Sequence, residues 1–320
     1  MDDDYFDAIQ EEIAGVVEST GVVLDKSNRT QLLTALKKLF LRTSNNFSEI
    51  AAAGSAAVTA ALANLGLSDV AHLPQLTGVI GTSRNARMSV TAASATATFT
   101  ADELIVQTAL GGRQYKLTNF NKIINLATNG AGGMDTGTVP AAGFVALYAI
   151  YNPTTQISAL LAVNATSVLA PEVYSGANMP SGYTASALVS VWRTASSQFT
   201  VGYQLDRSIS FPRITVLTTT TGTTPLLPIN MPNYLPINAK YCSVDGALGT
   251  STNGVVGMAF SSSLSGIAWR ASAMTTTAGY GSTYTAMNIP VITAQTIYYS
   301  ANATVGTLSN FASNLVDYVF

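Results

Sequence analysis

The stretch FVALYAIY, residues 144–151, decides the fold class of this chain. It contains the longest apolar run in the sequence and is followed by the turn pair Asn152-Pro153. An apolar run of this length between turn signals is typical of a buried strand. A membrane-spanning helix needs about 18 to 20 such residues, so we expect β-structure and no membrane insertion.

Similar runs lie on both sides of this stretch, from about residue 80 to the C-terminus. Val, Ile, Tyr, Phe and Thr recur at short intervals between clusters of Gly, Pro, Asn and Ser, without helical periodicity. We expect strands over residues 87–92, 103–108, 113–117, 122–127, 144–151, 157–163, 185–192, 199–205, 213–218, 240–244, 255–260, 267–273, 289–293, 296–301 and 315–320. Strands at this spacing predict antiparallel sandwiches or barrels.

A Thr-rich run, residues 218–224, is followed by Pro225, Pro228, Pro232 and Pro236. We interpret it as an extended crossing and place a break near residue 209. The expected β-domains are residues 81–208 and residues 209–320. One large sandwich with a long loop is the alternative.

Residues 1–45 predict a helical hairpin. Apolar residues recur at three- and four-residue steps on each helix, with Gly21 between the helices and Ser27 as the expected cap of the second. The expected apolar faces are Phe6, Ile9, Ile13 and Val17 on one helix, and Leu32, Leu33, Leu36, Leu39 and Phe40 on the other. Two short helices cannot bury both faces alone, so we expect these residues to serve in trimer formation or attachment.

Residues 46–80 form an Ala-rich linker. A short helix is expected at about residues 55–65, capped by Ser55. Its buried side would be Val58, Ala61, Leu62 and Leu65. Small Ala side chains would let chains pack closely around a threefold axis, although Ala is also simply a good helix former.

The chain of 320 residues carries little charge. Charged residues make up 10% of it, against about 25% in ordinary globular proteins. Such a surface predicts that subunits cover one another. Residues 1–72 hold ten acids and five bases, and residues 73–320 hold seven acids and ten bases. No basic stripe is present, so nucleic-acid binding is not expected.

The cysteine content and the N-terminus bear on disulfide formation and on export from the cell. Cys242 is the single cysteine, which excludes an intrachain disulfide, and we expect it to be a small buried hydrophobe. The acidic N-terminus does not resemble a signal peptide. We therefore expect synthesis in a host cytoplasm and release by lysis.

Catalysis is not expected, because the sequence contains few of the residue types that catalytic sites use. The single histidine, His72, lies in the linker, and one His with one Cys cannot form a Ser-His-Asp, Cys-His or usual zinc site. Glycan cleavage needs two facing carboxyl groups. Asp135 and Glu172 lie in expected loops and are the pair that could converge. We expect no metal or cofactor.

With catalysis not expected, the remaining functional feature is a binding surface. Aromatic residues gather between positions 269 and 300 among Ser, Thr, Gly and Asn, a mixture that binding surfaces use. The candidate receptor-binding residues are Trp269, Arg270, Tyr280, Tyr284, Tyr298 and Tyr299. The alternative is that these rings fill the sandwich core.

Several segments resemble the tail fibres of contractile-tailed and related phages and prophages. They are DDDYFDAIQEEI at residues 2–13, LDK at 24–26, QLLTAL at 31–36, FSEI at 47–50 and ALANLGL at 61–67. ALYAIYNP at residues 146–153 and YSGANMPSGYTA at 174–185 look similar to segments of phage tail proteins. The resemblance covers residues 1–72 well and residues 100–208 moderately.

The resemblance implies an elongated homotrimer in the virion, joined to tail or baseplate proteins through its N-terminal region. The expected function is multivalent, non-catalytic attachment to host lipopolysaccharide, another surface glycan or an outer-membrane protein. A tailspike-like polysaccharide depolymerase and a purely structural collar or decoration protein are the alternatives.

Overall fold

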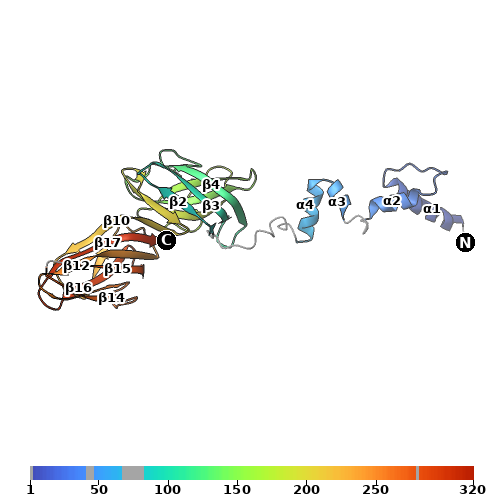
Figure 1. Ribbon diagram of the computed structural model, residues 1–320. Helices are drawn as coiled ribbons and strands as arrows, with labels where there is room; N and C mark the ends of the chain where they lie inside the picture. The colour runs from blue at the N-terminus through green and yellow to red at the C-terminus, as the bar shows by residue number, and fades with distance from the viewer. Residues whose placement is uncertain (1–2, 41–46, 67–82, 279–280) are drawn as a thin grey trace. The chain divides into compact units, whose positions relative to one another are not determined.

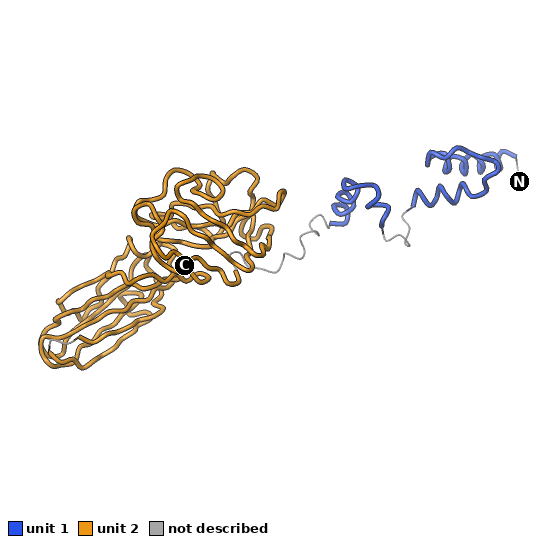
Figure 2. Tube along the Cα trace, turned by 45° about the horizontal axis from the view of Figure 1, so that its top comes forward, with its two compact units in different colours: residues 1–73 blue, residues 74–320 orange. Residues whose placement is uncertain are grey.

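The structure is a computed structural model that describes residues 3–40, 47–66, 83–278 and 281–320. The chain divides into two compact units, residues 1–73 and 74–320 (Figure 2). The described part of the first is helical, and the second is built from antiparallel strands (Figure 1). The prediction of a mainly β chain with N-terminal helices is confirmed.

The first two helices, α1 (Asp3–Glu18) and α2 (Gln31–Leu39), form a hairpin. The acids Asp3 and Asp4 lie in the first turn of α1, where the helix dipole favours negative charge. The predicted cap of the second helix is wrong. Ser27 instead donates from its backbone N and its Oγ to Asp25 Oδ1, so it belongs to a turn, and α2 begins four residues later.

Two shorter helices follow, α3 (Ser48–Ala52) and α4 (Ser55–Asn64). Gly54 separates them with φ +93°, a conformation that glycine adopts without strain. Ser55 is therefore the first helical residue and not the cap. Leu65, which was expected on the buried side, is exposed.

Nine strands make up the first part of the β unit. They are β1 (Ser83–Arg84), β2 (Arg87–Val90), β3 (Thr96–Gln107), β4 (Gln114–Asn125), β5 (Ala142–Asn152), β6 (Ile157–Asn164), β7 (Ala185–Ala195), β8 (Gln198–Phe199) and β9 (Gly202–Leu205). β3 and β7 join through the single pair Gln107–Ser186, and β4 packs against β6. The sheet therefore folds over into two layers that enclose a core.

Eight strands make up the second part. They are β10 (Ser208–Thr219), β11 (Thr223–Asn230), β12 (Tyr241–Thr250), β13 (Gly254–Ser261), β14 (Arg270–Thr276), β15 (Gly281–Pro290), β16 (Thr296–Ala303) and β17 (Leu308–Val319). The order β15-β12-β17-β10 forms one layer and β11-β16-β13-β14 the other. Phe260 of β13 lies 6.3 Å from Phe311 of β17, ring centre to ring centre, so the layers pack face to face.

Several predicted strand boundaries are wrong. The three short strands expected over residues 103–108, 113–117 and 122–127 are parts of the two long strands β3 and β4. The expected crossing after residue 218 contains β11, an edge strand in which Pro225 and Pro228 are tolerated. β15 was missed except for its last two residues.

One sheet runs through both parts of the β unit. Ser208 of β10 pairs with Leu205 of β9 and with Val319 of β17. The predicted break near residue 209 therefore falls inside a hydrogen-bonded strand, and the division into domains 81–208 and 209–320 stays a prediction.

Candidate functional site

Two of the six predicted receptor-binding residues, Tyr284 and Tyr299, belong to the core. Each is only 6% exposed, and both rings stack on Phe311, with ring centroids 5.7 and 5.4 Å away. The Tyr284 hydroxyl donates a 2.8 Å hydrogen bond to the Ala312 carbonyl oxygen, and burial raises its pKa. The prediction that these two rings contact a receptor is wrong, because they fill the sandwich.

The other predicted residues are placed differently. Tyr280 lies outside the described residues. Tyr298 is half-buried on β16, opposite Ser261 of β13. Trp269 is 51% exposed, and Arg270 follows it at the start of β14. Trp269, Arg270 and Tyr298 therefore lie at one end of the sheet β11-β16-β13-β14.

Residues 262–269 form the connection from β13 to β14, which we call the Trp269 loop. Hydrogen bonds within it fix its shape. Ser261 Oγ donates to the Ile267 carbonyl oxygen at 2.8 Å, and the Ser262 backbone N donates to the same oxygen at 2.8 Å. The backbone N of Gly266 donates to the Ser263 carbonyl oxygen at 3.1 Å. The loop is therefore held by Ser262 and Ser263 and by Ser261 at the end of β13.

The backbone of this loop presents the indole of Trp269. Gly266 has φ +81° and Ala268 has φ +56°. A Cβ added at Gly266 would lie 3.6 Å from the Trp269 Cε3 atom, so the ring rests over the glycine. A left-handed Ala is unusual, and such backbone strain gathers at functional positions. The exposed indole is thus a positioned side chain.

Arg270 ties the loop to the neighbouring strand. Its Nε and Nη2 atoms donate to the carbonyl oxygens of Met287 and Asn288 at 2.9 and 2.8 Å. Other apolar side chains on the loop and beside it are also exposed, namely Leu264, Ile267 and Met287. An exposed apolar patch among polar hydroxyls is typical of a contact surface.

The sequence did not identify this loop. Residues 267–269 were predicted as the start of a strand, whereas β14 begins at Arg270. The available signal was the run Ser261-Ser262-Ser263-Leu264-Ser265-Gly266, whose hydroxyls and glycine favour a turn. If this run had been predicted as a turn, Trp269 would have been placed at the end of a loop.

The structure describes three of the residues considered for catalysis, namely Cys242, Asp135 and Glu172. Cys242 is buried, which raises the pKa of its thiol to about 12 and keeps it protonated. Asp135 Oδ2 accepts a 3.0 Å hydrogen bond from the Tyr174 hydroxyl at a cavity of about 160 Å³. His72 lies outside the described residues.

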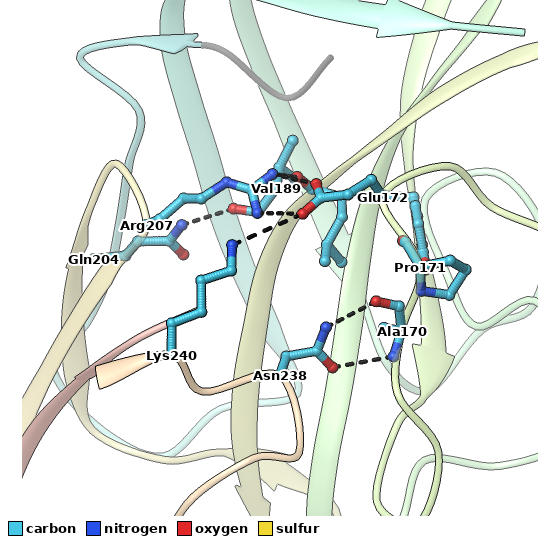
Figure 3. Close-up of polar contacts among 10 residues, drawn as sticks. Ala170, Pro171, Glu172, Val189, Gln204, Arg207, Asn238 and Lys240 are labelled. Carbon is cyan, nitrogen blue, oxygen red and sulfur yellow. Dashed lines mark hydrogen bonds and ion pairs between the residues drawn. The ribbon is translucent and has the colours of Figure 1, made fainter. Parts of the chain in front are cut away.

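Glu172, the other candidate carboxylate, is engaged in an ion pair (Figure 3). Arg207 donates to both of its oxygens, at 2.9 and 2.5 Å, and Lys240 Nζ lies 4.0 Å from Oε1. Nearby, Asn238 and Ala170 exchange two hydrogen bonds, from the Ala170 backbone N and from Asn238 Nδ2. These contacts fasten residues 170–172 to Arg207, Asn238 and Lys240, which lie in connections between strands.

The predicted helix faces are largely uncovered in the described part of the helical unit. Val17 is buried, and Leu32 and Leu36 are half-buried. The exposed members of the two faces are Phe6, Ile9, Ile13, Leu33, Leu39 and Phe40. As expected, two helices do not bury both faces.

No family model matches the chain. It is 47% identical over 81 residues to a protein of Escherichia coli strain K12 named uncharacterized protein StfP. That region is 25% of this chain and 38% of the relative, so the chain covers well under half of the relative's length.

Two solved structures show weak similarity. One is TmCBM61 in complex with β-1,4-galactotriose, at 15% identity and TM-score 0.20, covering 39% of this chain and 73% of that one. The other is the T13 IBDV viral particle, at 14% identity and TM-score 0.25, covering 77% and 71%. No helix in the described residues is long and apolar enough to cross a membrane.

Proposed function

We propose that this chain is a phage tail fibre protein that attaches to the host bacterial surface without catalysis. The Trp269 loop would contact a surface glycan, with an outer-membrane protein as the other possible receptor class. The chain would act in the virion as a homotrimer joined to the tail through its N-terminal helices.

The exposed indole of Trp269, held over Gly266, is the observation that carries the proposal. Aromatic rings give large contact areas with little loss of conformational freedom. Sugar rings stack on such faces, and the nearby serine hydroxyls offer hydrogen bonds. A single contact of this kind is weak, but several copies on one particle multiply it.

Assembly is supported by the apolar helix faces and by the low charge of the chain. The resemblance of residues 1–72 to tail fibres supports attachment through that region. The absence of catalysis is supported by Glu172, because an ion-paired carboxylate beside Arg207 is a poor partner for a second carboxyl group.

Adsorption of Trp269→Ala tests the proposal. We expect fluorescently labelled wild-type protein to bind at least one of a panel of bacterial envelopes that includes E. coli K12. The variant should bind at least about tenfold more weakly, because tryptophan is a frequent binding hot spot. Its melting temperature should not change.

Leu110→Ala is the matched control, since Leu110 is also an exposed apolar residue of the β unit but lies far along the chain from the loop. Wild-type adsorption by Trp269→Ala would overturn the role of the loop. Release of reducing sugar from host polysaccharide would instead favour the depolymerase alternative.

A further inference from the structure

A bulge in β10 opens a cavity in the β unit. Ser210 pairs with Asp317 of β17, and Ile214 pairs with Leu315, so three residues of β10 lie opposite one residue of β17. The three are Phe211, Pro212 and Arg213. Proline lacks a backbone N–H and favours such an irregularity, and bulges redirect side chains.

The cavity beside this bulge has a volume of about 230 Å³. Trp192 and Tyr318 line its floor and are buried. Their polar atoms are already satisfied: Trp192 Nε1 donates to the Thr200 carbonyl oxygen at 2.9 Å, and the Tyr318 hydroxyl donates to the Val191 carbonyl oxygen at 2.6 Å. The floor therefore presents mainly apolar ring surface.

Two arginines, Arg193 and Arg213, line the same cavity. Arg193 Nε donates to the Asn233 carbonyl oxygen at 3.0 Å, and its guanidinium lies over the Tyr234 ring at 5.2 Å. The side chain of Arg213 is 72% exposed, and its Nε donates to Asp245 Oδ2 at 2.6 Å. In the part of the chain that the structure describes, neither arginine uses an Nη atom in a hydrogen bond.

Positive charge dominates around this cavity. Asp245 is the carboxylate that faces Arg213, and it also accepts a 3.2 Å hydrogen bond from Asn314 Nδ2. Asp317 precedes Tyr318 on β17, so its side chain points to the opposite face, where Ser243 hydrogen-bonds to it. Residues 73–320 carry three more bases than acids, which favours the approach of anions.

From this arrangement we infer that the bulge cavity binds a compact anionic group, a phosphate or a carboxylate carried on a sugar ring. The four Nη atoms supply donors suited to an anion, and guanidinium binds such groups with paired hydrogen bonds. The ring that carries the anion lies against the apolar floor. This site is separate from the Trp269 loop and does not depend on it.

The chain offers a direct readout for binding. Its two tryptophans are Trp192 and Trp269. In a Trp269→Phe background, tryptophan emission reports only Trp192, which lines the cavity. Inorganic phosphate, glucose 1-phosphate, glucuronate and uncharged glucose are titrated at low ionic strength.

We expect saturable changes in Trp192 emission with the anions and none with glucose. Stronger binding of glucose 1-phosphate assigns phosphate as the group, and stronger binding of glucuronate assigns carboxylate. In this background, Arg213→Gln should weaken binding about tenfold, as expected for one charge-assisted contact. Asp245→Asn should strengthen it, because it removes the carboxylate that competes for Arg213.

Two further variants separate the site from general charge and from misfolding. Lys116→Gln removes the same charge from an exposed strand position and should leave binding unchanged. Val201→Glu places a negative charge at the cavity while keeping both arginines, and should also weaken binding. The inference is overturned if no anion binds, or if Arg213→Gln and Lys116→Gln behave alike while melting temperatures stay at the wild-type value. The outcome of the Trp269→Ala adsorption assay does not affect the anion titrations or the comparison of the cavity variants.

Discussion

The helical unit and the β unit use apolar residues in opposite ways. In the β unit, rings such as Phe99, Phe144 and Phe311 are fully buried. In the helical unit, Phe6, Phe40 and other large apolar side chains are exposed. Short helices gain most of their stability from packing. The β unit therefore carries its own core, whereas the helical unit presents apolar surface that its described residues leave uncovered.

The largest effect is expected from removing a core ring of the β unit. Tyr284→Ala should lower the free energy of unfolding by about 3–5 kcal/mol, because it opens a cavity beside Phe311. Urea unfolding followed by far-ultraviolet circular dichroism measures this. Tyr203→Ala, at an exposed tyrosine of β9, is the control and should change stability by less than about 0.5 kcal/mol. Equal effects of the two substitutions would remove the basis for placing Tyr284 in the core.

A smaller effect is expected from the polar contacts that fasten residues 170–172. Glu172→Gln leaves Arg207 without its counterion, and we expect a loss of about 1–2 kcal/mol in the same urea assay. Glu103→Gln breaks the exposed pair with Lys116 and should cost less than about 0.5 kcal/mol. A neutral Glu172→Gln would show that apolar packing alone holds this region.

The helical unit should respond in its assembly and not in the stability of the β unit. Light scattering on a sizing column should give a wild-type mass near three times 33.3 kDa. Phe40→Ala should leave the urea midpoint of the β-sheet signal unchanged and make the oligomer dissociate at about tenfold higher protein concentration, because burial of a phenylalanine contributes about 1.5–3 kcal/mol. A monomeric wild type would contradict the proposed homotrimer.

The smallest effect concerns pH, and the two units should respond in opposite directions. Hydrogen bonds from Ser27 lower the pKa of Asp25, so the stability that this carboxylate gives to its turn is lost as pH falls through that lowered pKa. Burial raises the pKa of Asp317, so its contribution is more favourable at acidic pH and is lost as pH rises through the raised value. Helix and sheet signals should therefore shift oppositely as pH crosses the usual Asp value of about 3.9. Asp25→Asn and Asp317→Asn should each abolish one of the two shifts.

Sequence patterns predicted the parts of the β unit whose strands are buried on both faces. β5 is a nearly continuous apolar run for that reason, and in β7 the apolar residues up to Trp192 are interrupted only by Ser186 and Ser190. In β15, Tyr284 and Ala286 face the core while Thr283 and Thr285 face outward, an alternation typical of a half-buried strand that was not recognised among so many small polar residues. The same alternation made Tyr284 look like one aromatic of a polar contact surface.

The bulge cavity was beyond sequence reasoning for a different reason. Arg193 and Arg213 lie in separate strands and line one cavity beside the bulge of β10 between Ser210 and Ile214. Pro212 inside an apolar stretch was the one local sign of that irregularity. When strand pairing brings two distant residues to one cavity, no local sequence pattern marks them.

The strand β10 also has a thermodynamic consequence. It is hydrogen-bonded to β9 of the first part and to β17 of the second, so neither part can melt completely without removing a partner from the other. Calorimetry of the β unit should then show one cooperative transition, with equal calorimetric and van't Hoff enthalpies, where two separate domains would give two.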